Sequence, residues 1–307
     1  MTKRLLCIAI FSVIIFCENI IAQGVTTAAI SGMVTNAKGE ALPGVTVMAV
    51  HEPTGTRYGI TTREDGKYNL PNLKVGGPYT VTASIVGYAK KEKKDIYLQL
   101  SQTERQDFVL SEENVQMEVT EITAERNTIL NSSRTGAATS VNKNSIESLP
   151  TITRRIQDFS RLTPQASGSS FVGQDNRYNN TTVDGSYFNN SFGLGGQPGD
   201  RTGVAPISIE AIEQIQVNIA PYDVRQGNFV GAAVNSTTKS GTNEISGAAY
   251  YIFRNEKLVG TKAGDLTYNP GTFRYNQIGV RLGGPIIQDE LFFFTSFEND
   301  ALVQLGT

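Results

Sequence analysis

The stretch APISIEAIEQIQVNIAPYDVRQGNFVGAAVNSTTKSGTNEISGAAYYIF, residues Ala205 to Phe253, decides the fold. Its first half combines a predicted short helix with short apolar strands and glycine turns. From Asn243 onward, small and aromatic residues alternate, which predicts a strand with one apolar side. The stretch therefore predicts a boundary between a mixed α/β domain and a sheet of longer strands.

Beyond this boundary, three runs of alternating residues follow one another, at 245–253, 274–283 and 290–298. In the second run, Ile278, Val280 and Leu282 alternate with Gln277, Gly279 and Arg281. Each run is close to the roughly 9–11 residues that cross a bilayer as a tilted strand. The first connection is long and the second, GGPIIQDE, is short, which is typical of outer-membrane barrels. Three strands alone do not exclude a soluble meander.

Before the boundary, residues 128–242 predict an α/β domain. Helices are expected at Ile146–Leu149, before Pro150, at Thr153–Leu162, before Pro164, and at Ile207–Ile215. Strands are expected at Thr182–Gly185, with a tight Asp-Gly turn, at Gln216–Ile219 and at Gly231–Thr238.

Residues 29–110 predict a compact β-sandwich. Glycine, proline and aspartate turns separate seven short runs rich in β-branched and aromatic residues: ISGMVT, GVTVMAVH, YGITT, KYNLP, PYTVTASIV, DIYLQL and RQDFVL. Apolar residues recur at every second position, as at Tyr79, Val81, Ala83 and Ile85, so one side of each strand is buried. Regular spacing of short strands favours a sandwich over a parallel sheet.

The first 22 residues predict a secretory signal peptide. Lys3 and Arg4 precede an apolar core, Leu5 to Phe16, that is too short for a transmembrane helix, and cleavage is expected after Ala22. A lipoprotein anchor at Cys17 is the alternative, but Phe16 is large where such sites need a small residue. Both cysteines, Cys7 and Cys17, lie in this segment, so the mature chain is expected to lack cysteine.

Composition excludes several classes of function. Without the signal peptide the chain has 25 basic and 28 acidic side chains, a net charge of −3, and no long basic run, so nucleic acid is not an expected partner. No motif of a hydrolase or phosphate-binding loop is present, and we expect no enzyme activity and no cofactor. The single histidine, His51, predicts a surface residue at a strand end and cannot form a metal site alone.

Two parts of the chain resemble known families. Residues of the sandwich resemble the carboxypeptidase-regulatory-like, or carbohydrate-binding-like, domain: Gly32, Val34, Gly39, Leu42, Pro43, Gly44, Val45, Val47, Thr61, Asp65, Gly66, Tyr68, Leu70, Gly87 and Tyr88. The opening stretch, together with RYNQIGVRLGGPIIQDELFFFTSFE, resembles the passage from plug to barrel in TonB-dependent outer-membrane receptors of the Oar-like or SusC-like branch.

The resemblance implies a mainly β fold, with a seven-stranded prealbumin-like β-sandwich, an α/β plug domain and the first strands of an incomplete outer-membrane β-barrel. The expected boundaries are 1–22 for the signal peptide, 26–110 for the sandwich, 111–127 for a linker, 128–242 for the plug and 243–307 for the truncated barrel. The expected location is the outer membrane, with the N-terminal domain in the periplasm.

The resemblance also implies two functional segments. The candidate TonB box in the linker, which would bind TonB by strand addition, is Met117, Glu118, Val119, Thr120, Glu121, Ile122 and Thr123. The candidate ligand contacts in an apical loop of the plug are Asp184, Tyr187, Phe188 and Phe192.

The implied function is energised uptake of a large solute through a plugged barrel. The expected partners are TonB, outer-membrane lipid, an extracellular solute of unknown identity and, as a further possibility, a SusD-like surface lipoprotein. The alternative is a carbohydrate-binding or adhesive surface protein built on the sandwich, which the absence of tryptophan weakens.

Overall fold

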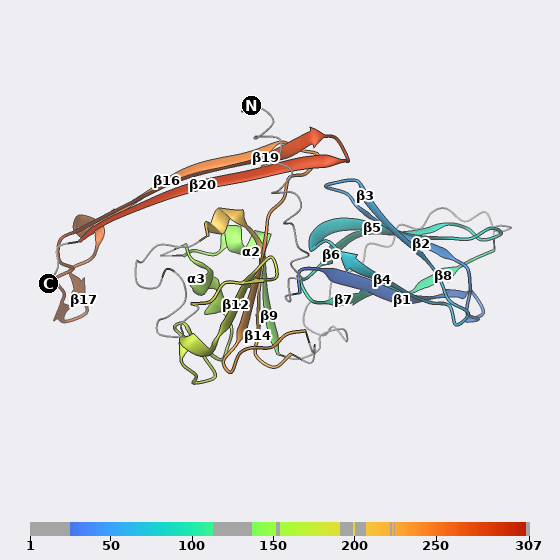
Figure 1. Cartoon of the computed structure of the whole chain (residues 1–307), viewed down its shortest axis with the longest axis horizontal. Coiled ribbons are helices and arrows are strands. Elements are labelled where there is room, and N and C mark those ends of the chain that lie inside the picture. The colour runs from blue at the N-terminus through green and yellow to red at the C-terminus, as the bar shows by residue number, and fades with distance from the viewer. Residues whose placement is uncertain are drawn as a thin grey trace, which may run out of the picture.

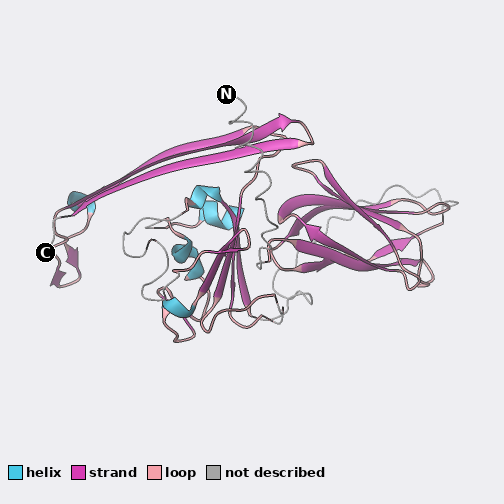
Figure 2. Cartoon of the chain, in the orientation of Figure 1, coloured by secondary structure: helices cyan, strands magenta, loops and turns pink. Residues whose placement is uncertain are grey.

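The computed structural model describes residues 25–112, 137–151, 154–190, 199, 207–221, 223 and 225–304. Three bodies of β-structure follow one another along the chain (Figure 1). Figure 2 shows that the helices of the described residues lie beside the second body and at the far end of the third. Among these residues, no helix is both long and apolar enough to cross a membrane.

The first body is a β-sandwich. Its strands are β1 (Ala28–Asn36), β2 (Thr46–His51), β3 (Thr56–Thr61), β4 (Lys67–Leu73), β5 (Gly76–Ser84), β6 (Lys91–Leu98), β7 (Thr103–Arg105) and β8 (Phe108–Leu110). One antiparallel sheet has the order β3-β2-β5-β6. In the other, β4 pairs with β1, and β1 pairs in parallel with both β7 and β8.

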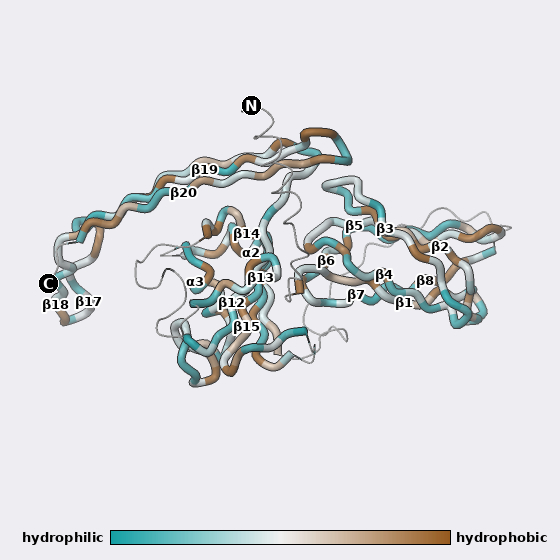
Figure 3. The backbone as a smooth tube through the Cα atoms, in the orientation of Figure 1, coloured by the Kyte–Doolittle hydropathy of each residue, from teal (hydrophilic) through white to brown (hydrophobic). Residues whose placement is uncertain are grey.

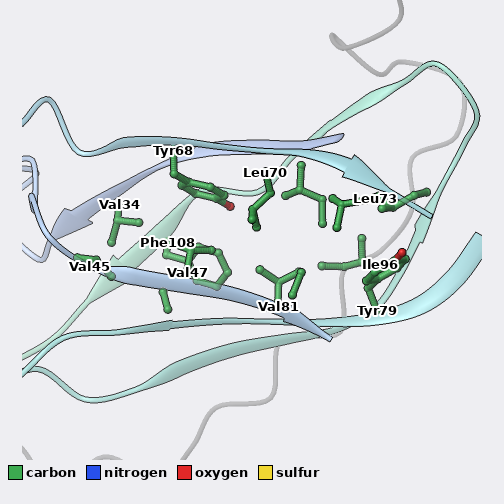
Figure 4. Packing of buried hydrophobic residues seen from close by; sticks show 14 of the residues in the cluster. Val34, Val45, Val47, Tyr68, Leu70, Leu73, Tyr79, Val81, Ile96 and Phe108 are labelled. Atoms are coloured by element: carbon green, nitrogen blue, oxygen red, sulfur yellow. The ribbon is translucent and has the colours of Figure 1, made fainter. Parts of the chain in front are cut away.

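The sandwich core lies between the two sheets (Figure 4). Alternate residues of each strand enter it, as the sequence predicts: Tyr79, Val81 and Ala83 of β5 are buried. Figure 4 shows Val34, Leu70 and Phe108 of one sheet facing Val47 and Val81 of the other. Each large aliphatic or aromatic side chain buried here contributes about 1.5–3 kcal/mol, so this core is a major source of the stability of the sandwich.

The last predicted run, RQDFVL, is divided into two strands, which brings the sandwich to eight described strands instead of seven. Between β7 and β8, Gln106 turns its backbone toward β1, where its amide donates to the carbonyl oxygen of Ser31 at 2.7 Å. The Tyr68 hydroxyl donates to the carbonyl oxygen of Gln106 at 2.5 Å. The last run is therefore divided where the backbone of Gln106 comes close to that of Gly32. A side chain at position 32 would collide with Gln106.

The prediction that His51 lies on the surface is wrong. Its side chain is 3 % exposed, its Nδ1 lies 2.7 Å from the Thr54 hydroxyl, and its ring packs 4.9 Å from that of Tyr79. Burial, and secondarily the positive charge of Lys74, lowers the pKa of His51 to about 4. The imidazole is therefore a neutral part of the sandwich core.

This histidine makes the sandwich sensitive to mild acid. Its pKa in the folded state, about 4, lies below the unfolded value of 6.5, so the stabilising effect is complete above pH 6.5 and is lost as the pH falls toward 4. We expect acidification from pH 7 to 4 to remove up to about 3 kcal/mol more unfolding free energy from the wild type than from His51→Gln. Parallel pH profiles from urea denaturation would contradict this assignment.

The second body is a five-stranded sheet with small helices. The strands have the order β13 (Ser186–Tyr187), β12 (Asn180–Val183), β15 (Ala233–Thr238), β14 (Ile212–Asn218) and β9 (Ala138–Asn142). Helices α2 (Lys143–Ser148) and α3 (Ile156–Ser160) contact β14. The remaining elements are β10 (Ala166–Ser167), β11 (Ser170–Phe171), η1 (Asn176–Tyr178) and η2 (Ile209–Ala211). The apolar core holds Ile146, Phe159, Ile215, Val217 and Val234.

The helices and strands predicted for this body are found with the expected type except around Ile212, whereas β9, β10, β11 and β13 were not predicted. The expected helix at 207–215 is only the short η2, and the chain is already a strand from Ile212. Ile209, Ile212 and Ile215 are spaced like one face of a helix, but β14 pairs with β15 on one side and β9 on the other. Pairing on both sides overrides this local pattern.

The third body is an antiparallel sheet of three long strands, β16 (Ser246–Asn255), β19 (Phe273–Ile287) and β20 (Leu291–Gln304). The long connection after β16 contains η3 (Glu256–Leu258), β17 (Lys262–Ala263) and β18 (Leu266–Thr267), whereas a short turn joins β19 to β20. The three predicted runs are confirmed as strands, and all three are longer than predicted.

The two sides of this sheet differ in chemistry. Apolar residues alternate along its strands (Figure 3), and one side exposes Tyr251, Phe253, Ile278, Val280, Leu282 and Phe297. The other side carries the buried Tyr275 and Gln277 and is directed at the second body. The alternation predicted for Gln277 to Leu282 therefore corresponds to two physical surfaces.

Candidate functional site

A cluster of charged and polar side chains joins the second body to the long strands. Its members come from α2, from the segments around α3 and η2, from the end of β15 and from all three long strands: Glu147, Arg154, Ser208, Glu210, Lys239, Tyr250, Arg281 and Glu298. We call this set the ionic cluster.

Glu210 lies at its centre. Its Oε2 lies 2.9 Å from Nε of Arg281 on β19, and its Oε1 pairs with Arg154. The side chains of Glu210 and Arg281 are only 18 % and 16 % exposed, so neither charge is well solvated. The position of Glu210 follows from η2, where Ser208 is the N-cap and accepts a hydrogen bond from the Glu210 amide at 3.3 Å.

A second anion, Glu298 of β20, accepts hydrogen bonds from the Ser208 hydroxyl at 2.7 Å and from the Tyr250 hydroxyl. The Arg154 guanidinium lies 4.7 Å from the centroid of the Tyr250 ring. This ring lies across Gly279, where any side chain would collide with it. Gly279 therefore leaves room for the tyrosine to reach from β16 to β20.

Lys239 completes the cluster at the end of β15. Its Nζ lies 3.3 Å from Oε1 of Glu147, which also lies 3.5 Å from Arg281. Burial, and secondarily the nearby Arg281, lowers the pKa of Lys239, while Glu147 and Glu210 act in the opposite direction. Three cations thus face three carboxylates, and the ionic cluster carries no net formal charge. Such pairing is needed where charges leave water.

The ionic cluster was not predicted from the sequence. A partial signal existed, because Arg281 belongs to the polar set that alternates with Ile278, Val280 and Leu282. Its partners, however, lie 71 to 134 residues earlier in the chain, at Glu210 and Glu147. Sequence spacing gives no information about such contacts.

The candidate ligand contacts Asp184, Tyr187 and Phe188 lie at the turn between β12 and β13 and just after it. Asp184 has a positive φ of 47°, and its carboxylate accepts hydrogen bonds from the amide and the hydroxyl of Thr238, at 2.8 and 2.7 Å. Tyr187 is exposed, and the Phe188 amide donates to the carbonyl oxygen of Thr181 at 2.7 Å. Asp184 therefore has a structural role at this turn, whereas Tyr187 presents its ring to solvent.

The other predicted positions lie outside the described residues. They are Phe192, the whole candidate TonB box from Met117 to Thr123, and the predicted signal peptide at 1–22. Within the described part of the chain, no group of three or more His, Cys, Asp or Glu side chains could hold a metal ion.

Two family descriptions match the chain. Residues 29–111 match the carboxypeptidase regulatory-like domain, and residues 237–307 match the outer membrane beta barrel domain. The first range covers the eight strands of the sandwich, and the second covers the three long strands.

Among curated proteins, the chain is similar to the TonB-dependent transporter Oar of Myxococcus xanthus, with 27 % identity over 257 residues. The match covers 78 % of this chain but only 23 % of that protein, so the chain spans about a quarter of its relative. Among solved structures, the siderophore receptor PirA of Acinetobacter baumannii matches 53 % of this chain and 24 % of its own, at 22 % identity and a TM-score of 0.41. The outer membrane transporter YddB of Escherichia coli matches 53 % and 26 %, at 16 % identity and the same TM-score.

Proposed function

We infer that this chain, which belongs to the TonB-dependent outer-membrane receptors, takes part in the energised uptake of a large solute across the outer membrane. The observation that carries this proposal is the two-sided sheet of β16, β19 and β20. Its exposed side is apolar, as a barrel wall facing lipid must be, and its inner side pairs with the second body through the ionic cluster.

In this proposal the second body belongs to a plug domain with the predicted bounds 128–242, which fills the pore. Lodging a separate domain against a barrel wall requires contacts that hold it firmly when no solute passes. The ionic cluster supports such a role, because α2 and η2 pair with β19, Ser208 binds Glu298 of β20, and Arg154 packs on Tyr250 of β16. Tyr187, Phe188 and Phe192 are the proposed solute contacts of the plug, of which Phe192 lies outside the described residues.

The topology supports a periplasmic position for the sandwich. Short turns of outer-membrane barrels face the periplasm, and long loops face outward. The sandwich lies at the short β19–β20 turn, and the β17–β18 loop lies at the opposite end (Figure 1). The Asn243 amide, just before β16, donates to the carbonyl oxygen of Pro53 at 2.8 Å, which connects the sandwich to that end.

We further propose that TonB binds the segment Met117–Thr123 by strand addition, and that outer-membrane lipid covers the exposed side of the long strands. A SusD-like surface lipoprotein is a further proposed partner. The matched domains and relatives give no reason to propose a catalytic activity.

A capture experiment tests the function and the binding segment together. In cells that produce the complete protein, we expect the wild type in the outer-membrane fraction and captured by the periplasmic domain of TonB. Val119→Pro should reduce capture at least tenfold, because proline removes a backbone donor that strand addition needs. The fractionation should not change.

The matched control is Asn127→Pro, which introduces the same residue four positions beyond the segment. Capture should be unaffected by this variant. Equal loss in both variants would show that the linker, and not the segment, matters. A product absent from the outer membrane would overturn the receptor function and leave the adhesive alternative.

A further inference from the structure

The two sides of strand β14 are both buried but have opposite chemistry. Ile215 and Val217 belong to the apolar core, together with residues of α2 and α3. The intervening residues Gln214, Gln216 and Asn218 are polar and equally inaccessible. Their cross-strand partners on β15 include Thr237 and Asn235, which are polar as well. The sheet therefore has a second, polar side, and something must cover it.

The cover is the turn between β6 and β7 of the sandwich. The Leu100 amide donates to Oε1 of Gln214 at 3.1 Å, and the Leu100 carbonyl oxygen accepts from Nε2 of Gln216 at 2.7 Å. The neighbouring Ser101 hydroxyl oxygen accepts from Nε2 of Gln226 at 2.8 Å. Side-chain amides of the sheet body thus satisfy the backbone of a turn in another domain.

Two buried apolar side chains in these turns lie outside both apolar cores. Leu100 is 0 % exposed and Val75 is 5 % exposed, yet neither belongs to the apolar core of the sandwich or to that of the sheet body. Val75 lies in the β4–β5 turn, beside Lys74, whose ammonium group reaches the Ser240 hydroxyl. Both turns are at the end of the sandwich that faces the sheet (Figure 1).

We propose that the sandwich is a detachable cap on the polar side of the five-stranded sheet. Separation would leave both apolar cores intact and would expose few large apolar side chains, while the glutamines and asparagines would exchange their partners for water. Interfaces between domains that are largely polar permit such relative motion. The proposal does not depend on uptake; if the proposed function holds, the cap covers the plug on its periplasmic side.

A pair of cysteine variants tests whether the cap opens. Leu100→Cys and Leu98→Cys lie two residues apart and are equally buried, but Leu98 belongs to the sandwich core. In the otherwise complete chain, with Cys7 and Cys17 replaced by alanine, we expect a maleimide to label Leu100→Cys at least tenfold faster than Leu98→Cys. Equal rates, or no labelling of either before unfolding, would overturn the proposal.

A second measurement avoids any change at Leu100. The double variant Ser101→Cys with Gln226→Cys places one thiol on each side of the contact between Ser101 and Gln226, close enough for a short bismaleimide to join them. Cross-linking should slow hydrogen exchange of the Leu100 amide at least tenfold relative to the wild type, and the same double variant without cross-linker should not show this slowing. Exchange in the sandwich core, at Val81, should not change. An equally slow Leu100 amide in the wild type would mean that the cap does not open.

Discussion

Glu210→Ala is expected to destabilise the contact between the sheet body and the long strands more than any other single change in the ionic cluster. Removing this carboxylate leaves Arg154 without its carboxylate partner and leaves Arg281, which is only 16 % exposed, with the longer 3.5 Å contact to Glu147 alone. Breaking a buried pair by deleting one member typically costs about 3–5 kcal/mol, because the remaining charge is left without compensation. The partial exposure of the cluster places the expected loss near the lower end of this range.

The measurement is the free energy of unfolding of the purified protein from urea denaturation, with limited proteolysis between residues 207 and 245 as a local probe. Glu244→Ala is the matched control, because this glutamate is exposed and is close in sequence. It should change stability by less than about 0.5 kcal/mol. If both variants behave alike, the cluster does not hold the two bodies together.

High salt should have little effect on the wild-type cluster. Salt weakens ion pairs between exposed charges, with a Debye length of about 10 Å at 0.1 M that becomes shorter as salt is added, but partly buried pairs are screened much less. The exposed pair Lys67–Asp65 on the sandwich is of the first kind, and Glu210–Arg281 is of the second. The salt sensitivity of each pair therefore depends on how far it is buried.

The sequence predicts a strand well where its residues alternate between a side that faces solvent and a side that faces an apolar core. This condition holds for β5 of the sandwich and for β19, where Gln277 to Leu282 divide cleanly between two sides. It fails for β14, because Gln214 and Gln216 are buried under another domain although they are polar. Without a clear alternation, the spacing of Ile209, Ile212 and Ile215 also fits one face of a helix, which is why a helix was predicted there.

Functional sites were harder to predict than strands for a related reason. The ionic cluster and the cap both depend on contacts between residues more than 50 positions apart, such as Arg154–Glu210 and Leu100–Gln216. His51 was placed on the surface because a histidine at a strand end is commonly exposed. Its burial against Tyr79 depends on the pairing of β2 with β5, which no local pattern encodes.

Gly32→Val is expected to have the largest effect within the sandwich. A Cβ atom at this position would lie 2.7 Å from the carbonyl carbon of Gln106 and 3.0 Å from the Tyr68 ring, and closer still to the Gln106 carbonyl oxygen. Gln106 cannot retreat freely, because its amide donates to Ser31 and its carbonyl oxygen accepts from Tyr68. The substitution must therefore separate β1 from the β7–β8 segment or displace the buried tyrosine.

Overpacking alone typically costs about 1–3 kcal/mol, and the loss of the Tyr68 hydrogen bond adds about 1–3 kcal/mol for a buried group left unpaired. We therefore expect Gly32→Val to lower the free energy of unfolding by about 2–6 kcal/mol, measured by tyrosine fluorescence during urea denaturation. Gly59→Val is the matched control: this glycine is in edge strand β3, and its Cβ would have one contact, 3.9 Å from the Val47 carbonyl oxygen. Because β-branched residues suit strands, this control should be neutral or slightly stabilising. Similar losses in the two variants would mean that valine is disfavoured in the sandwich generally, and that the close approach at Gly32 is not what divides the last strand.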